Sequence, residues 1–156
     1  MFVPPTRSFP CFAMSSSSFP SLSFLRKFRH VAMPRDGNGL FRAVAKAYHQ
    51  DEDMHLMLRK SLMEHIMEDK HVYAPLFFGP RSFDSALING RQKGVWHPDL
   101  APVVLTAIAD FLCVTLEVYS YDGDSVQRVV YRPLEGAASS RVRLLLNRDH
   151  CDLLTA

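Results

Sequence analysis

Long apolar runs and cysteines are both scarce in this sequence. A membrane span requires about eighteen or more consecutive apolar residues, and polar or charged residues interrupt every apolar stretch well before that length. Cys11, Cys113 and Cys151 form no CxxC pair and no even-numbered set. We therefore expect no membrane span, no disulfide framework and no cysteine-rich zinc site. The same cysteine usage indicates a reducing intracellular compartment, which we expect to be the cytoplasm.

Acidic residues are missing from the first part of the chain. Residues 1–35 contain five basic residues and no acidic one, whereas the remainder contains 13 basic and 16 acidic residues. The net charge of +2 therefore hides a mildly acidic body, which argues against nucleic-acid binding. A length of 156 residues with 47% hydrophobic and 22% charged residues is typical of one soluble globular domain, which we expect to be a monomer.

The first 23 residues differ from the rest in composition. They are rich in serine, proline and phenylalanine and show neither a helical nor a strand period. Such a segment has no regular apolar face to bury, so we predict a disordered tail at residues 1–23 and an ordered domain at residues 24–156. The serine-rich, acid-free composition also resembles an organelle transit peptide, and a cleaved targeting segment is the alternative.

The ordered region begins with helical patterns and ends with strand patterns. Apolar residues recur every three or four positions in residues 40–48, 54–66 and 100–111, and the faces expected to be buried include Tyr48, Met57 and Phe111. Residues 82–89 predict a short helix. Residues 114–121 and 126–132 flank the turn DGDS and predict a hairpin, with further strands at 141–147 and 151–154. The fold class predicted is α+β, with a small, mainly antiparallel sheet packed with helices.

The loop DGNG at residues 36–39 runs directly into the first predicted helix. A helix N-terminus presents unpaired backbone N–H groups and the positive end of the helix dipole, so it stabilises a thiolate or an oxyanion. The loop has neither the GKS or GKT of a P-loop nor the third glycine of a dinucleotide fingerprint. We therefore expect an anion-stabilising loop and no cofactor.

A second chemically informative segment lies near the C-terminus. His150 and Asp152 are two residues apart, so on an extended strand their side chains share one face while Cys151 points to the other. The carboxylate can then hold the imidazole in one tautomer. This arrangement is the base-and-orienter half of a nucleophile–His–Asp triad.

Histidines are also frequent in the helical half of the chain, but His49, His55, His65 and His71 are not spaced as zinc ligands. Three of them lie on a helix flank among charged residues, so we expect them to be solvated. No metal site is predicted.

The two segments, in this order, resemble the ovarian-tumour (OTU) family of deubiquitinating cysteine proteases. In that family the first motif reads Asp-Gly-Asn-Cys-Leu-Phe-Arg, and the second is typically His, an aromatic residue, then Asp or Asn. Trp96, the apolar helix after it and the strand at residues 114–119 are similar to the middle of the family's sequence. The resemblance extends from about residue 24 to the C-terminus. It implies an OTU-like cysteine protease fold and ubiquitin or a ubiquitin-like modifier as the partner.

The resemblance also implies roles for individual residues. His150 would be the general base and Asp152 its orienter, while Asp36 and the following backbone N–H groups would shape the oxyanion hole. Gly39 occupies the position where the family has its nucleophilic cysteine. Loss of a triad nucleophile costs about a million-fold in turnover. Cys151 replaces the usual aromatic residue and is expected to be a small buried hydrophobe, and none of the three cysteines is placed to act as the nucleophile.

Three interpretations follow. The chain is an OTU-like deubiquitinase, acting by thiol-dependent isopeptide hydrolysis at the ubiquitin C-terminus, that is inactive because Gly39 is either an inactivating substitution or the mark of a natural pseudoenzyme. Alternatively, it is a non-catalytic module that binds ubiquitin or another protein. In the third interpretation it is an unrelated α+β domain, and Gly39 and His150 then lie far apart.

Overall fold

A six-stranded sheet forms the centre of the molecule. The computed structural model describes residues 14–19, 22–92, 94–147 and 149–156. The strands lie in the order β1–β4–β3–β5–β6–β2, and every neighbouring pair is antiparallel except the parallel pair β3–β5. The predicted α+β class with a mainly antiparallel sheet is confirmed. The strands are β1 (Met14–Phe19), β2 (Arg29–Val31), β3 (Val114–Asp122), β4 (Ser125–Tyr131), β5 (Ser140–Asn147) and β6 (His150–Thr155).

One edge of the sheet comes from the segment predicted to be a disordered tail. Met14–Phe19 form β1 and pair with β4 along the whole strand, from Met14 opposite Tyr131 to Phe19 opposite Val126. The structure departs from the prediction at these six residues and at residues 22 and 23, which begin the 3₁₀ turn Leu22–Lys27. The backbone of β4 offers an edge whose hydrogen bonds require no apolar periodicity in the strand that pairs with it, so the composition of the segment gave no signal. Residues 1–13, 20 and 21 lie outside the described residues.

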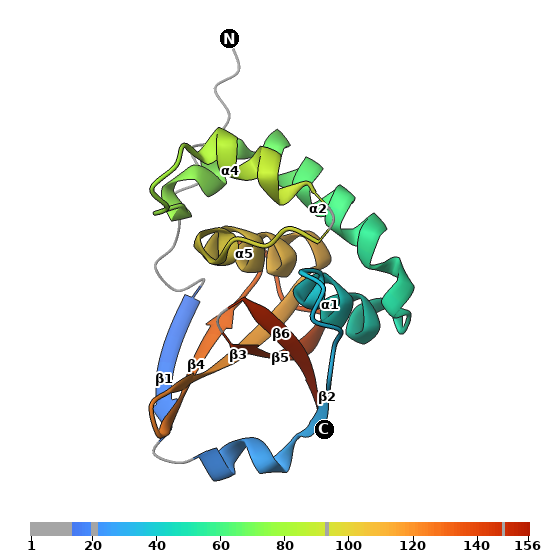
Figure 1. Ribbon diagram of the computed structural model, residues 1–156, viewed down its shortest axis with the longest axis vertical. Coiled ribbons are helices and arrows are strands. Elements are labelled where there is room, and N and C mark those ends of the chain that lie inside the picture. The colour runs from blue at the N-terminus through green and yellow to red at the C-terminus, as the bar shows by residue number, and fades with distance from the viewer. Residues whose placement is uncertain (1–13, 20–21, 93, 148) are drawn as a thin grey trace.

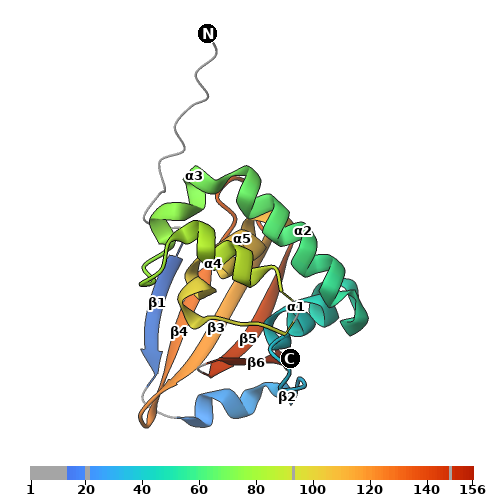
Figure 2. The ribbon, with the colours of Figure 1, turned by 45° about the horizontal axis from the view of Figure 1, so that its top comes forward.

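The main helices cover one face of the sheet in two tiers (Figures 1 and 2). The helices α1 and α5 pack directly on strands, and α2 packs on both of them. In Figure 1, α5 lies between the sheet and the outer helices α2 and α4. The helices are α1 (Gly39–His49), α2 (His55–Glu68), α3 (Lys70–Tyr73), α4 (Phe83–Gly90) and α5 (Ala101–Leu112), with 3₁₀ turns η1 (Leu22–Lys27), η2 (Glu52–Met54), η3 (Ala74–Leu76) and η4 (Pro98–Leu100).

Within the described ranges, no helix combines the length and apolar character that a bilayer crossing requires.

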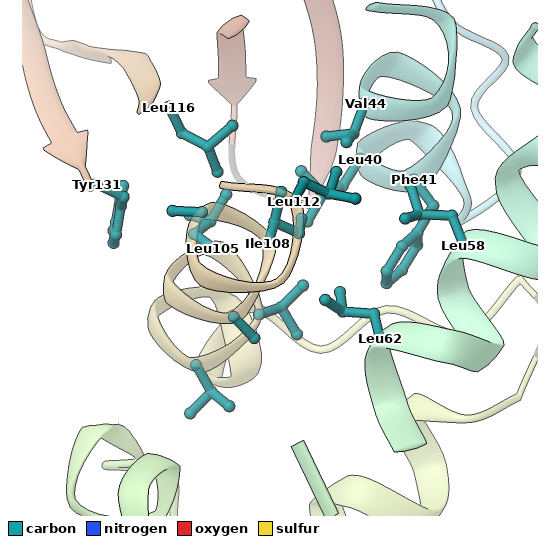
Figure 3. Close-up of a cluster of buried hydrophobic side chains, with 14 of the residues drawn as sticks. Leu40, Phe41, Val44, Leu58, Leu62, Leu105, Ile108, Leu112, Leu116 and Tyr131 are labelled. Carbon is teal, nitrogen blue, oxygen red and sulfur yellow. The ribbon is translucent and has the colours of Figure 1, made fainter. Parts of the chain in front are cut away.

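The apolar core is divided between the two faces of the sheet. Alternate strand residues such as Leu116 and Leu144 face the helices and join the larger cluster, part of which is drawn in Figure 3. On the opposite face, Tyr119 and Leu145 belong to a smaller cluster that Phe24 and Phe28 cover. This division follows from the two-residue period of a strand, which sends successive side chains to opposite faces.

The buried helix faces are narrower than the periodicity predicts. Tyr48 is 41% exposed, Met57 57% and Phe111 41%, so the expectation that these three are buried is wrong. The helical period marks an apolar stripe but does not show how much of that stripe a neighbouring element covers. His55 was expected to be solvated, but it is only 5% exposed at the first position of α2. Burial lowers the pKa of this imidazole, so it is held neutral.

Two leucines on α2 test the position of the core. Leu62 is 0% exposed, whereas Leu56 on the same helix is 42% exposed. We expect Leu62→Ala to lower the free energy of unfolding by about 2–5 kcal/mol, because it leaves a cavity between α1, α2 and α5. The matched change Leu56→Ala is expected to stay within about 0.5 kcal/mol. Urea denaturation of both variants measures the difference, and equal losses would contradict the packing described.

Candidate active site

The start of α1 and the start of β6 meet in space. Gly39 is the first residue of α1, and His150 is the first residue of β6. A Cβ placed on Gly39 would lie 3.4 Å from Nδ1 of His150, 3.3 Å from the backbone N of Cys151 and 2.8 Å from its carbonyl oxygen. The structure thus brings the two predicted segments together, contrary to the interpretation in which they lie far apart.

The side chain of His150 is held between this contact and a carboxylate. Its Nε2 lies 2.7 Å from Oδ1 of Asp152, so the two residues share one face of β6 as predicted. The residue between them is turned the other way: Cys151 is 2% exposed and joins the core beneath α1. Burial raises the pKa of the Cys151 thiol, which therefore stays protonated, as expected of a buried hydrophobe. The imidazole is consequently oriented with Nδ1 toward Gly39.

Asp152 has two further partners that the sequence did not reveal. Its Oδ1 accepts the backbone N–H of Met33 at 2.7 Å, and its Oδ2 lies 2.7 Å from Nε2 of His30. Burial by itself would raise the pKa of Asp152, but the hydrogen bonds from Met33, His30 and His150 outweigh it and lower the pKa. Asp152 is therefore a carboxylate at neutral pH, and β2 supplies part of its support.

The Asp36 carboxylate braces the loop before α1. Its Oδ1 accepts the backbone N–H of Asn38 at 3.0 Å, and its Oδ2 accepts Nη2 of Arg42 at 2.6 Å. Arg42 also bonds Glu52 at 3.2 Å, which joins the loop to the turn before α2. The hydrogen bond from Arg42 holds the pKa of Asp36 at about 2, below its usual 3.8. The side chain of Asp36 thus fixes the loop. Its role in shaping an oxyanion hole stays a prediction.

A second glycine loop is clamped against the first. Oδ1 of Asn38 accepts the backbone N–H of Gly94 at 2.8 Å and Nη1 of Arg59 at 3.2 Å. The loops pack backbone to backbone: Gly37 has φ +78°, and a Cβ on it would overlap the carbonyl of Gly94. Only glycine allows this approach with that backbone conformation.

Arg59 anchors the second loop and was missed from the sequence. It is 3% exposed, and it donates Nε to the carbonyl of Gly90 at 2.9 Å and Nη2 to the carbonyl of Val95. Its guanidinium also lies 4.7 Å from the centre of the Phe41 ring. The only sequence signal was an arginine beside the apolar stripe of α2, next to Leu58. Burial lowers the pKa of Arg59 to about 10, so the side chain keeps its charge at neutral pH.

The two loops and the β5–β6 turn enclose a surface pocket. Its volume is about 490 Å³, and it is lined by residues 35–37, by Gly94 and Trp96, and by Asp149 and His150. The indole Nε1 of Trp96 is buried and has no hydrogen-bond partner among the described residues. The pocket therefore opens onto His150 and onto the loop that leads into α1.

The described part of the site joins a helix N-terminus to an oriented His–Asp pair, and Gly39 adds no side chain between them. The first N–H groups of α1 have no partner within the helix. The roles of His150 as general base and Asp152 as its orienter stay predictions. Cys151 faces the core, and Cys113 lies at the far end of α5, where it caps the helix with φ 53°. Cys11 lies outside the described residues. Gly39 supplies no atom that could attack a carbonyl.

Comparisons with known proteins agree with this geometry. The chain is 29% identical over 106 residues to OTU domain-containing protein 5-A of Xenopus laevis, an alignment that covers 68% of the chain and 20% of that relative. The solved structure of the OTUD1 OTU domain superposes with a TM-score of 0.71 at 23% identity, covering 86% of the chain and 91% of that domain. The chain has the OTU fold.

A viral structure has a similar fold. The Hazara virus OTU, solved bound to ubiquitin, superposes with a TM-score of 0.65 at 18% identity, covering 90% of the chain and 87% of that structure. No family model matches the chain. The chain spans about a fifth of the length of the curated relative it matches. The resemblance to OTU proteins proposed from the sequence is thereby confirmed.

Asn38 offers a test of the clamp between the two glycine loops. Asn38→Ala removes the acceptor for the Gly94 N–H and for the buried Arg59, so we expect a loss of about 2–3 kcal/mol in the free energy of unfolding. The Gly94 amide should also exchange its hydrogen faster. Asn89→Ala, on α4 and outside both loops, is the matched control and should leave Gly94 protected. Unchanged exchange at Gly94 in Asn38→Ala would rule out the clamp.

Acid sensitivity tests the pairing of Asp36 with Arg42. Because the folded-state pKa of Asp36 is lowered from 3.8 to about 2, its contribution to stability is present above the unfolded pKa and is lost as pH falls through the folded pKa. Asp36→Asn should therefore be less stable than the parent near neutral pH, and the gap should narrow between about pH 4 and about pH 2. Urea midpoints across this range measure it. Asp124→Asn, at the exposed β3–β4 turn, should show no such convergence.

Proposed function

We propose that the chain is a non-catalytic OTU-type module that binds the C-terminal tail of ubiquitin or of a ubiquitin-like modifier. The observation that carries the proposal is the contact at Gly39. The backbone of β6 approaches so closely that a Cβ at this position would lie 2.8 Å from the Cys151 carbonyl oxygen, whereas ordinary van der Waals contact begins at 3.4 Å. A site built around a cysteine keeps room for its Cβ, so the geometry favours a pseudoenzyme over an enzyme with one lost side chain.

The preserved parts of the site support binding. A pocket of about 490 Å³ opens beside His150, and the N-terminus of α1 can receive a carbonyl oxygen there. The viral neighbour with the same fold was solved bound to ubiquitin. A polypeptide tail in this pocket lies against the backbone of Gly37 and Gly94 on one side and His150 on the other, which suits a tail with small side chains.

The second candidate function is thiol-dependent isopeptide hydrolysis in a version of the chain that carries cysteine at position 39. The His150–Asp152 pair, with Nδ1 aimed at Gly39, favours this ancestry. A thiolate there would attack the carbonyl, His150 would pass the proton to the leaving amine, and water would release the acyl group. Asp152 would hold the imidazole and stabilise its charged form.

Titration with ubiquitin tests the binding proposal. We expect the unaltered chain to bind ubiquitin, as followed by isothermal calorimetry or NMR shifts of residues around the pocket, and to release no product from diubiquitin chains. A rate of hydrolysis above that of a Gly39→Ala control would refute the non-catalytic assignment. An absence of binding to ubiquitin and to several ubiquitin-like modifiers would refute the partner.

Substitution of Gly39 tests both the close contact and the ancestry. Gly39→Ala and Gly39→Cys should each cost about 1–3 kcal/mol of stability, because the added Cβ forces β6 away from α1. Gly39→Cys should nevertheless form a covalent adduct with a ubiquitin probe that carries a C-terminal electrophile, and Gly39→Ala should not. Adding His150→Gln to Gly39→Cys should abolish the adduct. A folded Gly39→Cys variant that no modifier probe labels would count against a protease ancestry.

A further inference from the structure

The pocket beside Gly39 has an unusual arrangement of hydrogen-bonding groups. His150 is 9% exposed, and its Nε2 is bonded to Asp152. Its Nδ1 faces Gly39 and has no hydrogen-bond partner in the part of the chain that the structure describes. His150 also lines the pocket, so a ligand there can supply the hydrogen-bond partner that this nitrogen lacks. The atom that would meet it in a triad is the thiolate that Gly39 lacks.

The electrostatics of this position favour an anion. The positive end of the α1 dipole and its unpaired N–H groups point at the same place as the His150 imidazole. The Asp152 carboxylate lies on the far side of the ring and holds it through Nε2. In an active triad a thiolate would lie on the near side. Here Gly39 ends at its Cα, and the Cys151 carbonyl oxygen, which opposes an anion, lies close to this point.

Other charged groups of the pocket act in both directions. Arg35 lines it and adds positive charge. Asp36 also lines it, but its carboxylate is already paired with Arg42 at 2.6 Å. Asp149, exposed in the β5–β6 turn, opposes an incoming anion. Arg35 and His150 therefore favour an anion in the pocket, and Asp149 opposes it.

We propose that this pocket selects the free C-terminal carboxylate of a bound modifier tail over the same tail in amide linkage. The proposal rests on the tail-binding function above and specifies the chemical form of the partner. A carboxylate places one oxygen at the start of α1 and the other within reach of His150 Nδ1. It thereby takes the place of both the oxyanion and the missing thiolate. A carboxamide brings no charge, and its N–H group faces the backbone N–H donors, with which it cannot form a hydrogen bond. The chain thus binds released or unconjugated modifier selectively, which is the form that a hydrolase of the same fold would produce.

The test compares three forms of ubiquitin against the unaltered chain by calorimetry: the native C-terminal acid, the C-terminal carboxamide, and ubiquitin without its last two residues. We expect the acid to bind about ten-fold more tightly than the carboxamide, since charge-assisted hydrogen bonds are roughly twice as strong as neutral ones. The shortened form should bind more weakly than either.

Four variants assign the preference to this pocket. His150→Gln and Arg35→Gln should each reduce the ratio of acid to carboxamide affinity, and Asp149→Asn should raise it. Arg91→Gln, an exposed arginine outside the pocket, makes the same change in net charge as Arg35→Gln and should leave the ratio unchanged. A ratio that falls equally in Arg35→Gln and Arg91→Gln would indicate long-range charge and overturn the assignment.

The outcomes separate the two proposals. Equal affinity for acid and carboxamide, or tighter binding of the carboxamide, would overturn the carboxylate preference and leave tail binding standing. Full affinity for the shortened ubiquitin would overturn the preference and also the tail as the bound segment. An absence of binding to all three forms would overturn both.

Discussion

The contact between the first residue of α1 and the first residues of β6 is the constraint on which the site depends. It sets Gly39 against the backbone of Cys151, and it aims Nδ1 of His150 at the start of the helix. Every chemical property of the pocket follows from that approach: the helix dipole, the unpaired N–H groups and the imidazole act on one point because two chain segments meet there. The same closeness explains why glycine suits the position, since a Cβ has no room beside the Cys151 carbonyl.

The support for this contact comes from distant parts of the chain. Asp152 is held by β2 through the Met33 N–H and His30 as well as by His150. On the other side of the pocket, Asn38 ties the loop before α1 to the loop at Gly94. The buried charge of Arg59 is satisfied by carbonyls of Gly90 and Val95, so its hydrogen bonds fix the second loop without an acidic partner. The site is therefore held by a few buried side chains that bond backbone groups of distant segments.

Local patterns predicted the elements well and the contacts between them poorly. The three long helices, the β3–β4 hairpin and β5 followed from apolar period and turn residues, and the pairing of His150 with Asp152 followed from strand alternation. The meeting of Gly39 with His150 came from the resemblance of two motifs to a known family, because no local rule relates segments so far apart. The partnership of His30 with Asp152 spans 122 positions, and a serine-rich segment became β1 because β4 offered an edge. Such features depend on tertiary pairing, which one sequence does not display.

The hydrogen bonds of Asn38 and Arg59 connect the pocket to a remote surface. Arg59 lies on α2, its guanidinium bonds the end of α4 at Gly90, and its neighbours Leu56, Lys60 and Arg91 line a separate small hollow on the outer helices. A guest in the pocket that spreads the glycine loops must therefore strain the junction of α2 and α4. Linkage is reciprocal. If a guest in the pocket changes the affinity of the outer helices for a second protein, that protein changes the affinity of the pocket for the guest by the same factor. The pocket and the hollow have no lining residue in common, and the hydrogen bonds of Arg59 to Asn38 and Gly90 are what join them.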